Sequence, residues 1–167
     1  MAERIPRRAL LAGAAALALG SAGPAAARGR DEGDALTALV RAEEDAAYVY
    51  RTARLGGLAA ALAEQDAERA RALATQLEAL ALPIPGATRD RDGLPAAALA
   101  VLDARGDGAL RAAADYEQTL IDGCADALPL LKEPNTVRTV ATVLAGHAQH
   151  QALIRREAGG DALSSAG

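Results

Sequence analysis

The segment LAAALAEQDAERARALATQLEAL, residues 58–80, decides the fold. Its leucines recur every three or four positions, the spacing that places side chains on one face of an α-helix. Asp66 and Arg69 fall on the same face. The segment therefore predicts a long helix that buries a leucine stripe interrupted by charge. Gly56 and Gly57 precede it, and so short a link makes the preceding helix its antiparallel neighbour.

Helical spacing also occurs in three further long segments, at residues 34–55, 106–128 and 133–158. Asp34 is expected to cap the first of them. A short helix is expected at 96–103, within the connection between the second and third long helices. Four long helices, a tight first hairpin and a long middle connection predict an all-α fold, an antiparallel four-helix bundle with one long crossover connection.

The composition agrees with this class of fold. Hydrophobic residues make up 51% of the 167 positions, aromatic residues only 2%, and Phe and Trp are absent. A core of Leu, Val, Ile and Ala suits closely packed helices better than a sheet. The formal charge is −4 and no basic stripe is present, which argues against nucleic-acid binding. Cys124 is the only cysteine, so no disulfide can form within the chain.

The N-terminus has the pattern of an export signal. Arg7 and Arg8 directly precede an apolar run from Ala9 to Leu19, which is too short to span a bilayer. Ala25-Ala26-Ala27 then forms a small-residue cleavage site. Residues 1–27 are therefore expected to be a cleaved signal peptide. The arginine pair resembles a twin-arginine (Tat) signal, while Pro6, in place of the usual polar residue, leaves the Sec route open.

This signal defines the expected organisation of the chain. Residues 28–33 are expected to be a flexible mature N-terminus, 34–158 the bundle, and 159–167 a disordered tail. The mature protein is expected in the periplasm, the cell envelope or the medium, in contact with a membrane only during export. The sequence names no partner, and it is compatible with a homodimer.

Each predicted helix carries a polar interruption near the middle of its apolar face. These residues are Glu43 on the first, Asp66 and Arg69 on the second, Glu117 on the third, and His147 and His150 on the fourth. Burying an unpaired charge costs several kcal/mol, roughly. We therefore expect these groups to meet one another, or a bound ligand, inside the bundle.

Three short motifs carry a resemblance to a known family. They are RAEEDAAYVY at 41–50, EQDAERARAL at 64–73 and AGHAQHQAL at 145–153. They are similar to segments of the exported ferritin-like domains of uncertain function found in bacteria. The resemblance covers about Asp34 to Glu157 and implies a di-iron type of site, with one Glu on each of two helices and Glu-x-x-His on each of the other two.

Two residues depart from that ligand pattern. The second helix reads Asp66-x-x-Arg69 and the fourth reads His147-x-x-His150. A guanidinium has no lone pair for a metal, so Arg69 could instead supply positive charge to Glu43, Asp66 and Glu117.

Three hypotheses follow from these departures. The first is a metal-free, non-catalytic bundle with an Arg–carboxylate–His network and no cofactor. The second is a single iron or manganese bound by Glu43, Glu117, His147 and His150. The third is an active di-iron oxidoreductase. Glu43, Asp66, Glu117, His147 and His150 are the candidate metal ligands, and whether the protein is an enzyme stays open.

Overall fold

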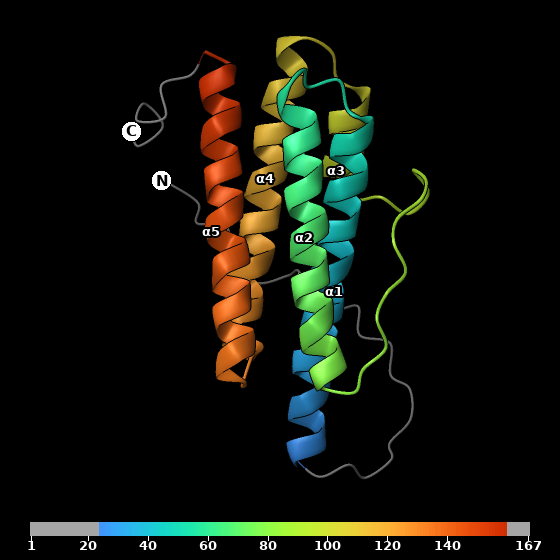
Figure 1. Ribbon diagram of the computed structural model, residues 1–167, viewed down its shortest axis with the longest axis vertical. Coiled ribbons are helices and arrows are strands. Elements are labelled where there is room, and N and C mark those ends of the chain that lie inside the picture. Colours follow the sequence, from blue (N-terminus) through green and yellow to red (C-terminus); the bar gives the residue numbers. More distant parts are fainter. Residues whose placement is uncertain (1–23, 160–167) are drawn as a thin grey trace, which may run out of the picture.

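The computed structural model describes residues 24–159, and this part of the chain is all-α, as predicted (Figure 1). The elements are α1 (Pro24–Thr52), α2 (Leu58–Ala79), α3 (Ala96–Asp103), α4 (Asp107–Ala127), the 3₁₀ turn η1 (Leu128–Leu130) and α5 (Pro134–Glu157). The predicted short helix at 96–103 is confirmed. Pro134 at the first turn of α5 needs no hydrogen bond there and has a suitable fixed φ.

The long helices lie side by side as two hairpins (Figure 1). The most extensive contacts join α1 to α2 and α4 to α5, whereas α2 meets α5 and α1 meets α4 over shorter stretches. Gly56 adopts a positive φ of 64° in the tight α1–α2 link, a conformation that glycine allows at little cost. The long connection from α2 runs outside the first hairpin to α3, which packs on α4 and α1 (Figure 1).

The start of the first helix differs from the prediction. α1 begins at Pro24, so Asp34 lies within the helix and does not cap it. Glu32, expected in a flexible segment, is buried, and its Oε1 accepts hydrogen bonds from the backbone N–H groups of Lys132 (3.0 Å) and Glu133 (3.3 Å). A polar segment is normally predicted to be exposed to solvent. Here the Glu32 carboxylate is buried because it binds free N–H groups at the start of α5.

The two ends of the predicted organisation are described only in part. Residues 1–23 of the expected signal peptide and the tail from 160 to 167 lie outside the described residues. Ala25–Ala27, the expected cleavage site, falls in the first turn of α1. No helix within residues 24–159 is both long enough and apolar enough to cross a membrane.

The apolar core is divided into two clusters by the polar layer. Along α1, Leu36, Leu39 and Val40 belong to one cluster and Val49 and Tyr50 to the other, with Glu43 between them. The other long helices repeat this division. On α2 Asp66 separates Leu62 from Leu73, and on α5 His147 and His150 separate Val143 from Ile154. The polar residues of these three helices therefore lie at the same level of the structure, between the two apolar clusters.

We expect the buried Glu32 carboxylate to stabilise the junction between α1 and α5. Replacing it in Glu32→Ala should lower the free energy of unfolding by about 1–3 kcal/mol, because two charge-assisted hydrogen bonds are lost. Urea denaturation of the purified protein measures this change. Asp31→Ala is the matched control, since Asp31 is exposed on the same turn. Equal stability of the two variants would contradict the capping role.

Candidate functional site

All five predicted site residues meet in the middle of the structure. Glu43 comes from α1, Asp66 from α2, Glu117 from α4, and His147 and His150 from α5. Each is at most 1% exposed. The helices hold them there because each residue occupies the buried face of an amphipathic helix, one or two turns from leucine or valine neighbours. Long-range contacts among five charged or titratable side chains therefore replace apolar packing at this level.

His147 lies at the centre of this network. Its Nδ1 is 2.8 Å from Glu117 Oε2, and its Nε2 is 2.7 Å from Glu43 Oε1. A carboxylate accepts hydrogen bonds, so both ring nitrogens must donate and the ring is an imidazolium. One side chain of α5 thus joins α4 to α1 through two charge-assisted hydrogen bonds.

The pKa values agree with this assignment. Burial alone would lower the pKa of His147, but the hydrogen bonds and negative charges of Glu117 and Glu43 outweigh it and raise the pKa from 6.5 to about 10. Burial likewise opposes ionisation of Glu117, yet the hydrogen bonds from His147 and His150 lower its pKa from 4.5 to about 2. The pair is charged across the physiological pH range.

Tyr50 extends the network toward the second apolar cluster. Its hydroxyl donates to Glu117 Oε1 at 2.6 Å. Burial, followed by the charge of Glu117, raises the pKa of Tyr50 well above 10, so the phenol remains a donor. Tyr50 lies seven residues after Glu43 and therefore on the same face of the helix. This spacing is the feature of the sequence that links Tyr50 to the network.

His150 completes the layer on the side of α2. Its Nδ1 lies 3.3 Å from Glu117 Oε1, and its Nε2 lies 2.8 Å from the Gln65 side-chain oxygen. Gln65 was not among the predicted site residues, because its position on α2 lies outside the leucine face. Its amide reaches the ring from the partly exposed edge of the network.

Arg69 lies against both Asp66 and His150. One of its guanidinium nitrogens donates to Asp66 Oδ1 at 2.6 Å. The two terminal nitrogens lie 3.3 Å from Nδ1 and 3.0 Å from Nε2 of His150. The nitrogens of an imidazole point in different directions, so one planar group cannot bond to both within the ring plane. The guanidinium therefore covers the face of the ring, an arrangement that arginine commonly adopts on flat side chains.

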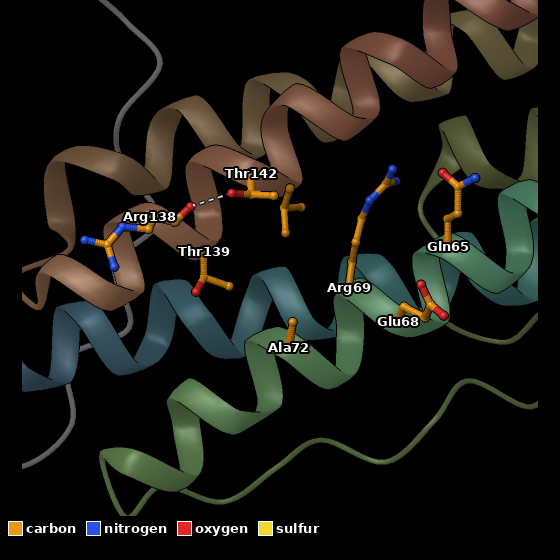
Figure 2. Close-up of a pocket in the computed structure, with 8 residues that line it drawn as sticks. Gln65, Glu68, Arg69, Ala72, Arg138, Thr139 and Thr142 are labelled. Carbon is orange, nitrogen blue, oxygen red and sulfur yellow. Dashed lines mark hydrogen bonds between the residues drawn. The ribbon is translucent and has the colours of Figure 1, made fainter.

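Arg69 reaches this position across a groove between α2 and α5. Figure 2 shows its side chain extending from α2 toward α5, with Thr139 and Thr142 of α5 in the opposite wall. The groove has a volume of about 680 Å³. Only 14% of the Arg69 side chain is exposed. The sequence suggested that Arg69 could supply positive charge to all three carboxylates of the site. In the described structure, Asp66 alone among these three is within bonding distance of Arg69.

Gly146 provides the space that the guanidinium occupies. A Cβ atom at this position would lie 2.7 Å from Arg69 Cζ and 2.8 Å from Nε, closer than real Cβ contacts. Gly146 lies inside α5, where glycine is unfavourable by roughly 0.5–1 kcal/mol relative to alanine. No pattern in the sequence indicates this pairing, because the two residues lie far apart along the chain and on different helices.

Three buried polar atoms in the described part of the chain lack a hydrogen-bond partner. They are Glu43 Oε2, Asp66 Oδ2 and the Tyr116 hydroxyl. Burial, with the negative charges of Glu43 and Glu117, raises the pKa of Asp66 to about 8 despite the bond from Arg69. This shift favours the protonated form of Asp66, and a proton there lowers the negative charge of the layer.

The donor types suit iron or manganese, but a two-metal centre does not fit these residues. Asp66, His147 and His150 offer ligand atoms within 4.8 Å of one another, and oxygen with imidazole is a set that these metals accept. Arg69 stands at one of the expected ligand positions and cannot bind a metal. A single ion would require His147 to give up a bond to a carboxylate and Arg69 to leave Asp66.

Cys124 has the surroundings of a core residue. It is 1% exposed, and burial followed by the charge of Glu43 raises the pKa of its thiol to about 12. A thiol in this state is a poor nucleophile. Glu64 and Glu68 on α2 are exposed and stand outside the network.

No family model, curated protein or solved structure matches this chain. What the site does is therefore inferred from its own geometry. Its strongest features are an imidazolium held between two carboxylates and a guanidinium held over a second imidazole. Such an arrangement binds four helices to one another through charge.

We expect Gly146 and Arg69 to be energetically coupled. Gly146→Ala should destabilise the protein by about 1–3 kcal/mol, the reverse of the usual effect in a helix, because the new methyl group displaces the guanidinium. The penalty should be much smaller in an Arg69→Ala background, where that space is free. Thermal denaturation of the double-mutant cycle measures the coupling.

The matched control for this cycle is Gly123→Ala in α4, where an added Cβ meets nothing within 4 Å. That variant should be neutral or slightly more stable. A Gly146→Ala protein as stable as Gly123→Ala would show that the guanidinium does not need the space.

We expect His147 to remain protonated at a pH of about 8, where an ordinary histidine is neutral. Its folded pKa lies above the unfolded value of 6.5, so its stabilising effect is complete below pH 6.5 and is lost as pH rises toward 10. Asp66, whose folded pKa is also raised, contributes in the same direction up to about pH 8. The free energy of unfolding should therefore fall between pH 7 and pH 10.

Nitrogen NMR of protein with labelled histidine tests this directly, because the chain has only two histidines. In chelator-treated protein, one ring should keep both N–H groups above pH 8. In urea both rings should titrate near 6.5. Two folded-state rings that both lose a proton below pH 7 would refute the imidazolium assignment.

Proposed function

We propose that this chain is an exported, non-catalytic ferritin-like bundle in which a buried arginine–carboxylate–histidine network stands where di-iron relatives hold metal. One observation carries the proposal: the Arg69 guanidinium bonds to Asp66 and covers His150. A cation at that place disfavours a metal ion beside it by direct repulsion.

Two features of the chain support the ferritin-like part of the proposal. The long helices form two hairpins joined by a long connection, and each supplies a polar residue to one layer. Asp66-x-x-Arg69 and His147-x-x-His150 keep the three-residue spacing of the metal-binding pairs in that family. The difference from that family is chemical. Arg69 stands where the pattern has a histidine ligand, and His147 stands where it has a carboxylate.

The charges of the layer support the metal-free part. His147 pairs with Glu43 and Glu117, and Arg69 pairs with Asp66. Burial and the neighbouring carboxylates raise the pKa of Asp66 to about 8, which favours its protonated form and lowers the negative charge of the layer. A layer of near-zero charge needs no divalent cation for its stability. Under this proposal the protein acts through its outer surface in the cell envelope or medium, with no redox centre inside.

A second candidate is a single-metal protein that binds iron or manganese through Asp66, His147 and His150. The close approach of these three ligands favours it, as do the unpartnered oxygens of Glu43 and Asp66. In that case Arg69 would turn outward into the groove between α2 and α5, along its flexible stem.

Metal analysis of the exported protein separates the two candidates. The protein is expressed from its full sequence, recovered outside the cytoplasm, and its N-terminus is determined, with Arg28 expected. Metal content is then measured by mass spectrometry before and after incubation with Fe(II) or Mn(II). We expect far less than one metal per chain and no change of melting temperature on adding either ion.

Two variants sharpen this result. Arg69→His restores an Asp-x-x-His pair and is expected to gain metal, whereas Arg71→His, on the exposed face of the same helix, is not. One tightly held metal in the wild-type protein would disprove the metal-free network and support the second candidate. If neither the wild type nor Arg69→His retains metal, both metal hypotheses fail. An N-terminus still at Met1 would contradict export through a cleaved signal.

A further inference from the structure

The charged layer approaches solvent at the groove between α2 and α5. The five predicted site residues that form the layer are each at most 1% exposed. Two residues of the groove wall bond to that layer, Arg69 to Asp66 and Gln65 to His150. The Arg69 side chain is 14% exposed, and its guanidinium also covers the ring of His150. Arg69 therefore separates the groove from Asp66 and His150.

The position of this guanidinium depends on three neighbours. It donates to Asp66 Oδ1 at 2.6 Å and covers the face of His150. It also occupies the space that a side chain at Gly146 would fill. All three contacts act on the group at the end of a flexible aliphatic stem, which can lie along a surface in more than one direction.

The groove offers the same group a second position. Its volume is about 680 Å³, and the wall opposite Arg69 carries Thr139 and Thr142 of α5 (Figure 2). Both threonine hydroxyls donate to backbone carbonyls of their own helix, at 2.9 Å in each case, so each oxygen can still accept a hydrogen bond from a guanidinium. The other charged residues of the wall, Glu68 and Arg138, have opposite signs.

We propose that the Arg69 side chain is a gate between the groove and the charged layer. In the closed position, the one seen in this structure, the guanidinium covers His150. In the open position it bonds to the threonines of α5, and small solutes in the groove reach Asp66 and His150. A side chain with two sets of partners exchanges between them while the helices stay folded. The gate requires neither a metal nor export, and it is independent of the function proposed above.

Two sets of substitutions shift the gate in opposite directions. Gly146→Ala places a methyl group where the guanidinium lies when closed, 2.7 Å from Arg69 Cζ, and so favours the open position. Replacing Thr139 and Thr142 together by valine removes the acceptors of the open position and favours the closed one. A purely structural role of Arg69 would not make access to His150 rise in one variant and fall in the other.

Modification of His150 by diethyl pyrocarbonate measures the opening, because this reagent reacts with an accessible neutral imidazole. The full chain, treated with chelator, is modified at neutral pH, and each of its two histidines is quantified by mass spectrometry. We expect His150 of Gly146→Ala to react at least about tenfold faster than in the wild type. His150 of the double valine variant should react about two- to fivefold more slowly.

Matched controls on α4 leave the groove unchanged. Gly123→Ala adds a methyl group that meets nothing within 4 Å, and Thr119→Val removes a hydroxyl that bonds to its own helix as Thr139 and Thr142 do. Both controls should react like the wild type. If Gly146→Ala does not fold, Arg69→Ala, which removes the gate, must give the same increase.

His147 and urea distinguish the gate from unfolding. His147 is one turn from His150 on α5 and 0% exposed, and it should remain unmodified in every folded variant. The rate at His150 should not change up to about 1 M urea, because moving one side chain exposes little surface. The gate is refuted if wild-type His150 does not react or if both histidines react equally in Arg69→Ala. It is also refuted if the double valine variant reacts as fast as the wild type.

Discussion

The hydrogen bonds of the His147 imidazolium to Glu117 and Glu43 are the interaction on which the rest of the structure depends. They join α5 to α4 within one hairpin and α5 to α1 across the two hairpins. Direct packing between the hairpins is modest compared with packing within each of them. Removing one charge from such a buried set leaves the others unpaired, at a cost of about 3–5 kcal/mol. The charged layer therefore determines the relative position of the hairpins as much as the apolar clusters do.

The network also occupies most of the hydrogen-bonding atoms of the carboxylates within it. Glu117 is held by His147, His150 and Tyr50, so its two oxygens are fully engaged. Glu43 and Asp66 each keep one buried oxygen without a partner. The network approaches solvent at the groove between α2 and α5, where the Arg69 side chain is 14% exposed and Gln65 bonds to His150.

The sequence predicted the helices well because leucine spacing and glycine or proline at the ends are local signals. It also predicted which charged residues would be buried, since Glu43, Asp66, Glu117, His147 and His150 interrupt apolar faces at similar depth. The predicted start of α1 was wrong, because the hydrogen-bond partner of Glu32 lies about a hundred residues away along the chain. The roles of Gln65 and Gly146 were missed for the same reason. Each depends on a contact between α2 and α5, and no local pattern reports such contacts.

The space above Gly146 has a consequence for how this sequence can vary. A side chain at position 146 would require the guanidinium of Arg69 to leave the place that it occupies now. A glycine at 146 in turn weakens α5 unless the arginine fills the space beside it. The residues at positions 69 and 146 are therefore expected to vary together among homologues of this chain.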